Sequence, residues 1–73
     1  MPEQNVRALA TAIRKARVEA GYTQEAFAAR IDLDRSYYGS IERGERNIGV
    51  EALATIATGL GTTAWQLLRK AGI

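Results

Sequence analysis

Cysteine and histidine are absent from the sequence, and proline occurs only once. Without thiols the chain forms no disulfide, and without thiols or imidazoles it lacks the usual zinc ligands. Its serines have no histidine that would activate them as nucleophiles. No run of about 18 apolar residues predicts a transmembrane helix, and no stretch resembles a secretory signal. We therefore expect a soluble cytoplasmic protein that is not an enzyme and that has no metal and no cofactor.

A large excess of one charge is also missing. Ten lysines and arginines stand against eight acidic residues, which gives a net charge of +2. Between Arg30 and Arg46 the charges balance, because four arginines are offset by two aspartates and two glutamates. Overall charge therefore does not establish a nucleic-acid partner. A basic surface on this stretch depends on the directions in which the side chains point.

The sequence does contain apolar residues at the spacing of an α-helix. With 73 residues the chain is expected to form one domain, residues 1–73, that hides ~60% of its unfolded surface. Apolar residues at steps of three and four predict a helix over about residues 5–20. Its expected buried face consists of Val6, Leu9, Ala10, Ile13, Ala16 and Ala20. No strand-like alternation occurs anywhere in the sequence.

Two further helices are predicted near the end of the chain. One covers about residues 50–58, with Val50, Leu53, Ala54 and Ala57 facing inward. The other covers about residues 63–71 and begins with a capping box formed by Thr63 and Gln66.

The stretch 23–43 predicts a pair of short helices. Thr23 is a suitable N-cap for the first, because its hydroxyl can accept a hydrogen bond from a backbone N–H. Asp34 can cap the second in the same way, and Gly44 follows it where a left-handed residue is favoured. Two helices of about eight to ten residues that are separated by a short turn are typical of a helix-turn-helix.

This stretch and its flanks resemble the Cro/C1 (Xre) family of helix-turn-helix regulators. The family's first-helix end and second-helix start are similar to IRKARVEAGYTQ (13–24), and the end of its recognition helix is similar to IERGERN (41–47). Within the family, LDRSY (33–37) is most similar to the controller proteins of restriction–modification systems. The resemblance spans about residues 6–68. It implies an all-α, compact five-helix, lambda-repressor-like DNA-binding domain.

In such a domain the second helix of the pair, the recognition helix, lies in the major groove. We expect Arg35 to read a base, because its guanidinium can bond O6 and N7 of guanine together; the alternative is a pair with Asp34 or a phosphate. Ser36 and Ser40 match family positions that contact bases, and the alternative for both is a solvated surface. The expected base-reading residues are Arg35, Ser36, Tyr37, Gly39 and Ser40. Tyr37 is predicted to face outward, and Gly39 either permits a close approach or is a tolerated weakness of the helix.

Phosphate contacts are expected on both sides of the recognition helix. The residues predicted to make them are Thr23, Gln24, Arg43, Arg46 and Asn47. The alternative for Gln24 is a cap on its own helix, and the alternative for the arginines is a solvated loop. Arg46 has a further alternative, which is contact with a base.

The resemblance also implies a structural ion pair between Arg17 and Glu42, which makes Glu42 part of the scaffold. The buried position of the second tyrosine, Tyr38, follows from the same family pattern. Two residues depart from that pattern, since Asp32 stands where glycine is usual and Ile48 where proline is common. Aspartate tolerates the left-handed region, so we expect the turn to persist.

Regulators of this kind bind palindromic DNA as two-fold dimers. Trp65, Leu68 and Ile73, in and after the helix at about 63–71, are the predicted dimer interface, because an exposed apolar patch often marks one. The alternative is that Trp65 covers the core of the monomer.

The predicted function is sequence-specific binding of a double-stranded DNA operator by a homodimer that regulates transcription. RNA polymerase is a further expected partner, and the expected location is a bacterial or phage-type cytoplasm, in association with the nucleoid. Neither a membrane nor a small-molecule ligand is expected. The alternative is an antitoxin or another protein-interaction module with the same fold.

Overall fold

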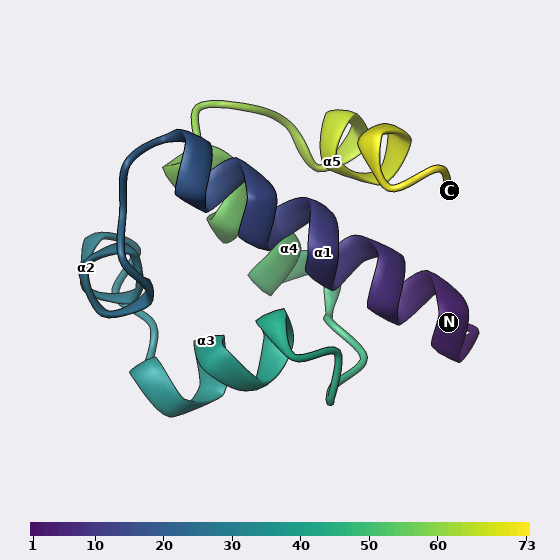
Figure 1. Ribbon diagram of the computed structural model, residues 1–73, viewed down its shortest axis with the longest axis horizontal. Coiled ribbons are helices and arrows are strands. Elements are labelled where there is room, and N and C mark those ends of the chain that lie inside the picture. The colour runs from purple at the N-terminus through teal and green to yellow at the C-terminus, as the bar shows by residue number, and fades with distance from the viewer.

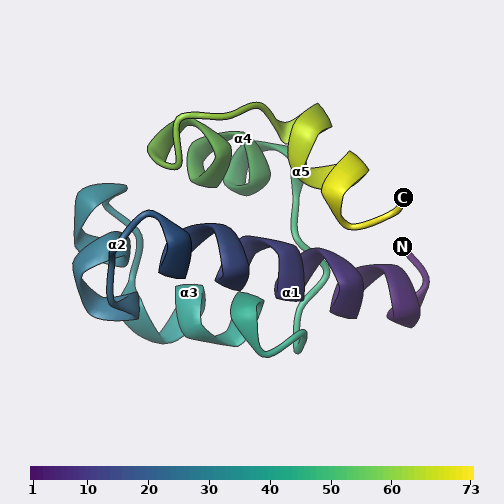
Figure 2. The same ribbon diagram turned by 45° about the horizontal axis from the view of Figure 1, so that its top comes forward.

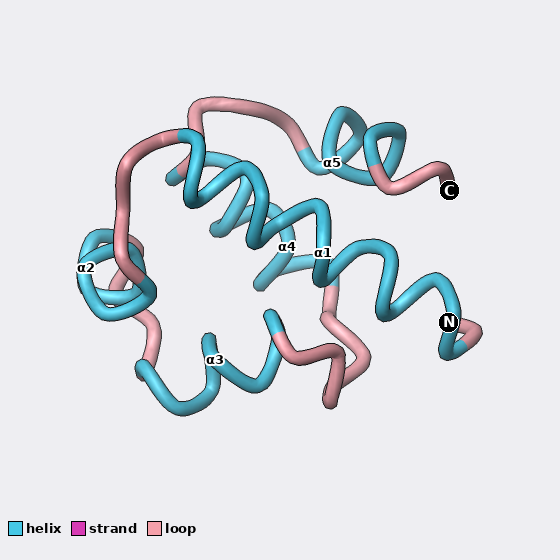
Figure 3. The backbone as a smooth tube through the Cα atoms, in the orientation of Figure 1, coloured by secondary structure: helices cyan, strands magenta, loops and turns pink.

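A computed structural model describes residues 1–73 as five α-helices without a strand (Figures 1 and 3). The helices are α1 (Glu3–Glu19), α2 (Gln24–Arg30), α3 (Arg35–Glu42), α4 (Val50–Gly59) and α5 (Ala64–Lys70). The predicted fold class is confirmed, and the predicted ranges differ from the observed ones only at the helix ends. None of the helices is long and apolar enough to cross a bilayer.

The longest helix, α1, lies between α3 on one side and α4 and α5 on the other (Figure 2). Helix α2 closes one end of the molecule, and both chain termini lie at the opposite end (Figures 1 and 2). All five helices contribute to the core, whose largest fully buried side chains are Leu9, Ile13, Phe27, Tyr38, Ile56 and Leu67. Burial of this apolar surface is the main driving force for folding.

The buried face of α4 differs from the prediction. Leu53 and Ala57 are buried as expected, but Val50 is 83% exposed and Ala54 is exposed as well. The missing member of the buried face is Ile56, which is 0% exposed. Leu53, Ile56 and Ala57 follow the i, i+3, i+4 spacing of a single helix face. Val50 lies three residues before Leu53 but is exposed, so the core does not extend to the first residue of α4.

The helix ends follow the predicted signals. The side chains of Thr23 and Asp34 each accept a hydrogen bond from the backbone N–H three residues later, at 3.1 and 2.9 Å. The capping box at Thr63 is present. Asp32 adopts a φ of +56°, so the turn between α2 and α3 persists without glycine. The buried face predicted for the first helix is wrong at Ala20. This residue is exposed because it is the C-cap of α1 and lies beyond the buried face.

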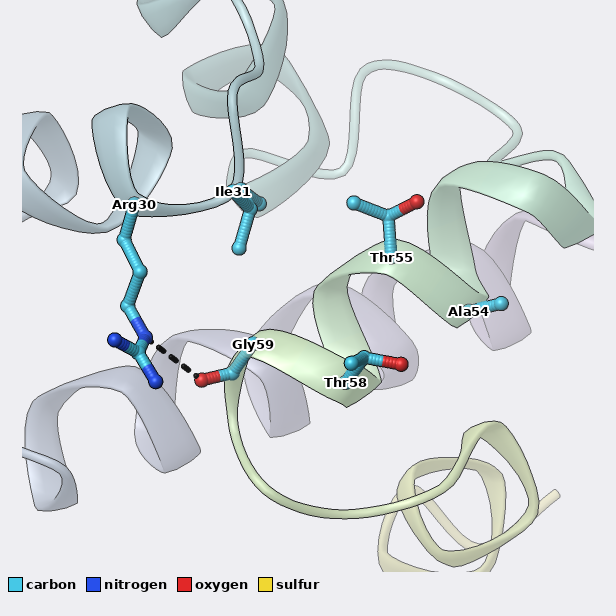
Figure 4. A pocket seen from close by; sticks show the side chains of 6 residues that line it. All are labelled: Arg30, Ile31, Ala54, Thr55, Thr58 and Gly59. Atoms are coloured by element: carbon cyan, nitrogen blue, oxygen red, sulfur yellow. Dashed lines mark hydrogen bonds between the residues drawn. The ribbon is translucent and has the colours of Figure 1, made fainter.

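Helix α2 packs closely against the end of α4, and Gly59 makes this approach possible. A Cβ at Gly59 would clash with Cγ2 of Ile31 and lie 3.2 Å from the ring of Phe27. Nε of Arg30 donates a hydrogen bond across the same junction to the carbonyl oxygen of Gly59 at 3.2 Å (Figure 4). The open cleft at this junction is lined by Arg30, Ile31, Ala54, Thr55, Thr58 and Gly59. None of these residues was predicted to contact DNA.

Candidate nucleic-acid interface

A buried polar cluster centred on Glu42 fixes the orientation of α3. Arg17 donates to both carboxylate oxygens of Glu42, from Nε at 2.7 Å and from Nη2 at 3.0 Å. The hydroxyl of Tyr38 and the amide nitrogen of Gln24 donate to the same carboxylate, the latter at 3.1 Å. The side chains of Arg17 and Glu42 are only 9% and 1% exposed. The predicted ion pair is therefore present, and the cluster also ties α2 to α3.

Burial and hydrogen bonding act in opposite directions on the pKa of Glu42. Burial alone would raise the pKa, but the hydrogen bonds from Arg17, Tyr38 and Gln24 outweigh burial and hold it below the usual 4.5. For Tyr38, burial and the neighbouring carboxylate both raise the pKa of the hydroxyl above the usual 10.0. At neutral pH the cluster therefore contains an ionised carboxylate that is bonded by a cation and by neutral donors.

The first turn of α3 faces solvent. Arg35 and Ser36 are exposed, Tyr37 is half-buried, and Tyr38 is fully buried as predicted. The side chain of Arg35 is 68% exposed and pairs loosely with Glu25 of α2, whose Oε2 lies 3.8 Å from Nε. An exposed pair at this distance contributes little stability. The guanidinium of Arg35 is therefore available to an external ligand.

Gly39 and Ser40 do not face outward as predicted. Both are buried, Ser40 to 6% exposure. The Ser40 hydroxyl donates to the carbonyl oxygen of Tyr37 at 2.6 Å and accepts from Nε of Arg46 at 2.7 Å. A Cβ on Gly39 would lie 3.0 Å from Nη1 of Arg43, so the absent side chain leaves room for that guanidinium. Both residues are therefore less accessible than expected, and their base-reading role stays a prediction.

The residues predicted to bind phosphate fall into two groups. Thr23 and Gln24 begin α2, where the Thr23 hydroxyl caps the helix and the Gln24 amide bonds Glu42. Arg43, Arg46 and Asn47 lie at and beyond the end of α3, and all three are exposed. Thr23 is exposed as well and Gln24 is half-buried, so both groups are accessible to a phosphate backbone, the second more fully.

Two exposed acidic residues beside the arginines were not singled out from the sequence. Glu45 accepts a hydrogen bond from Nε of Arg43 at 3.0 Å, and Glu25 lies near Arg35. The hydrogen bond from Arg43 holds the pKa of Glu45 below the usual 4.5, so this carboxylate is charged at neutral pH. The equal number of arginines and acids between residues 30 and 46 was the signal that could have identified Glu45, whereas Glu25 lies outside that stretch.

The predicted dimer-contact residues lie on and after α5. Trp65 is 63% exposed and Ile73 is 47% exposed, while Leu68 is half-buried against the core. The guanidinium of Arg69 lies over the Trp65 ring, 5.4 Å from its centroid. Trp65 therefore does not cover the core. Helix α5 lies on the opposite side of α1 from α3, so an interface there leaves α3 open (Figure 2).

Sequence comparison places the chain among helix-turn-helix proteins. The model of the helix-turn-helix family matches residues 13–65. Control protein C.MunI of Mycoplasma sp. is 56% identical over 45 residues, which are 62% of this chain and 61% of C.MunI. Control protein C.SmaI of Serratia marcescens is 37% identical over 65 residues, which are 89% of this chain and 77% of C.SmaI. The chain thus spans about three fifths of the length of C.MunI.

Solved structures give the same result. The restriction–modification controller protein C.AhdI from Aeromonas hydrophila superposes with a TM-score of 0.81 at 34% identity, over 85% of this chain and 94% of C.AhdI. The controller protein C.Esp1396I, in the structure of its tetramer with a natural 35 base-pair operator, matches with a TM-score of 0.81 at 34% identity over 92% of each chain. The predicted resemblance to Cro/C1-type regulators, and to restriction–modification controllers among them, is confirmed.

Proposed function

Because the chain belongs to the helix-turn-helix family, we propose that it is a sequence-specific transcription regulator that binds a palindromic DNA operator as a homodimer. The observation that carries this proposal is the exposed first turn of α3, where Arg35 and Ser36 face solvent while Tyr38 and Glu42 anchor the opposite face. A helix that is anchored to the core on one side and carries polar residues on its solvent-exposed side is suited to bind in the major groove.

Within this proposal Arg35 reads a base. The guanidinium of Arg35 is accessible and only loosely paired with Glu25. It can therefore donate two hydrogen bonds, one to O6 and one to N7 of a guanine. Ser36, one residue further along the same turn, can donate to or accept from a base edge. Tyr37 follows in the same helix and is half-buried, and the guanidinium of Arg46 lies over its ring.

Phosphate contacts come from Thr23 and Gln24 at the start of α2 and from the end of α3 with the loop that follows. Arg43, Arg46 and Asn47 are exposed there and would grip the DNA backbone next to the groove that α3 occupies. Each arginine that binds a phosphate releases counterions, so the binding constant should fall with added salt. At Arg43 a phosphate competes with Glu45, whose carboxylate accepts a hydrogen bond from Nε of the arginine.

Dimerisation supplies the remaining specificity, because one helix reads too few base pairs to define a site. We place the dimer contact at Trp65, Leu68 and Ile73, since Trp65 and Ile73 are large exposed apolar side chains and lie away from α3. Occupancy of promoter DNA in the bacterial cytoplasm would then exclude RNA polymerase or recruit it. No part of this activity requires catalysis.

Selection from a pool of random DNA duplexes at ~150 mM salt tests the proposal. The bound duplexes are sequenced after several rounds, with the Arg35→Ala variant carried in parallel. The proposal predicts an enriched palindrome for the wild-type protein and loss of enrichment at defined base pairs for Arg35→Ala. An unenriched wild-type pool contradicts the proposal and favours a protein partner.

A further inference from the structure

Buried Ser40, half-buried Tyr37 and exposed Arg46 form a side-chain cluster between α3 and the loop that follows it, which we call the Arg46 clamp. Nε of Arg46 donates to the Ser40 hydroxyl at 2.7 Å, and that hydroxyl donates to the carbonyl oxygen of Tyr37 at 2.6 Å. The guanidinium carbon of Arg46 lies 5.3 Å from the centroid of the Tyr37 ring. A loop residue is thereby held against the recognition helix by two contacts of different kinds.

The clamp uses only part of the guanidinium. Nε is engaged by Ser40 and one face of the group lies over the Tyr37 ring, whereas Nη1 and Nη2 make no hydrogen bond to the protein. These two nitrogens form the end-on fork that bonds two acceptors at once, on a phosphate or on a guanine edge. The clamp therefore leaves the Nη1/Nη2 fork of this exposed residue without a hydrogen bond to the protein.

Arg43, three residues earlier, provides a contrast. Its Nε is bonded at 3.0 Å to the carboxylate of Glu45, and the two side chains are 55% and 57% exposed. The charge of Arg43 is therefore offset by a carboxylate with which an incoming anion must compete. Arg46 is held by a hydroxyl and a neutral ring, and Glu45 acts on it only through its charge, without a hydrogen bond.

We propose that Ser40, together with Tyr37, is a positioning residue that pre-orders Arg46 for DNA binding. The inference rests on the DNA-binding function proposed above, and it assigns Ser40 a role through Arg46 in place of contact with a base. An arginine in the loop between α3 and α4 would otherwise lose side-chain freedom when it binds DNA. Because the clamp restricts the Arg46 side chain when the protein folds, less conformational entropy is lost when Arg46 binds DNA. The contact between Arg46 and DNA is therefore stronger.

A double-mutant cycle on the operator duplex recovered by selection tests the proposal. Ser40→Ala should weaken operator binding about threefold to tenfold, the size expected for ordering one long side chain on binding. In an Arg46→Ala background the same change should have no effect, because there is no guanidinium left to position. Ser36→Ala is the matched control, since Ser36 is an exposed serine of the same helix and its effect should be independent of Arg46.

A second measurement needs no DNA. In the free wild-type protein, the Nε–Hε proton of Arg46 should exchange with water more slowly than that of Arg35, and Ser40→Ala should abolish the difference. Equal exchange rates in the wild-type protein overturn the clamp. An equal loss of affinity from Ser40→Ala with and without Arg46 also overturns it, whereas a wild-type protein that binds no duplex overturns the proposed function itself.

Discussion

Arg17 and Glu42, 25 residues apart in the sequence, form a two-point ion pair that joins α1 to the recognition helix. The pair lies on the face of α3 that is turned away from solvent, and Tyr38 completes it from within the same helix. Since α2 and α3 are short, their orientation depends on contacts with the rest of the protein. This cluster and the apolar core therefore determine the orientation of α3. The scaffold and the candidate interface are thus opposite faces of one helix.

Glu42→Ala should lower the free energy of unfolding by ~3 kcal/mol or more, because it leaves Arg17 buried without a partner. The matched control is Glu3→Ala, which removes an exposed ion pair with Arg7. The side chain of Arg7 is 72% exposed and that of Glu3 is 77% exposed. That control should cost no more than about 0.5 kcal/mol. Urea denaturation of both variants measures the difference. Equal small losses would show that the Arg17–Glu42 pair is not buried in solution.

Acid should destabilise the protein through Glu42. Its pKa is below 4.5 in the folded state, so the unfolded state binds the proton more readily. The stabilisation is therefore complete above the unfolded pKa and is lost as the pH falls through the folded pKa. Unfolding measured from about pH 7 down to about pH 2.5 should show a steeper loss for the wild-type protein than for Glu42→Gln, whose side chain does not titrate. Parallel curves would contradict this role for the carboxylate.

Trp65→Ala should weaken dimerisation while leaving the folded monomer almost unchanged, because Trp65 is 63% exposed. A central interface tryptophan typically contributes 2 kcal/mol or more, so the dimer dissociation constant should rise by about 30-fold. Sedimentation equilibrium over a range of concentrations measures the constant. Val50→Ala is the control, because Val50 is 83% exposed on α4 and lies outside the predicted interface. A dimer as tight as wild type in Trp65→Ala would place the interface elsewhere.

Glu45→Gln should tighten DNA binding by about twofold to fivefold at low salt, since it frees Arg43 and removes a negative charge near the phosphates. Added salt should reduce the gain because both effects are electrostatic. Glu51→Gln provides the control, because Glu51 is an exposed residue of α4 on the other side of α1. Fluorescence anisotropy titrations at several salt concentrations measure the difference. An equal gain from both variants would reflect net charge alone.

Much of the fold was predictable from local signals. Thr23, Asp34 and Thr63 were recognised as N-caps because their hydrogen bonds reach only three residues along the chain. The buried face of α4 was less predictable, because Val50 and Ile56 are equally apolar and only the tertiary packing distinguishes them. Val50 is exposed, whereas Ile56 is enclosed by the core.

The candidate site was predictable in its residue types but less so in their roles. The position of Arg35 on the exposed turn followed from helix periodicity. That Ser40 bonds Arg46, six residues away, depends on how the loop after α3 folds back, and no local pattern reports this. The pairing of Arg43 with Glu45 was likewise hidden, because it depends on the backbone turn at Gly44, where φ is +72°.

The central claim is that the exposed turn of α3 reads DNA sequence, and one pair of titrations tests it most directly. The affinity for the selected palindrome is compared with that for a scrambled duplex of the same composition, for the wild-type protein and for Arg35→Ala. We predict that the wild-type protein prefers the palindrome by about 10³-fold or more. Arg35→Ala should reduce this preference by about fivefold to 100-fold, mostly through weaker binding to the palindrome. Equal affinity of the wild-type protein for the two duplexes, or an unchanged preference in Arg35→Ala, would contradict the account.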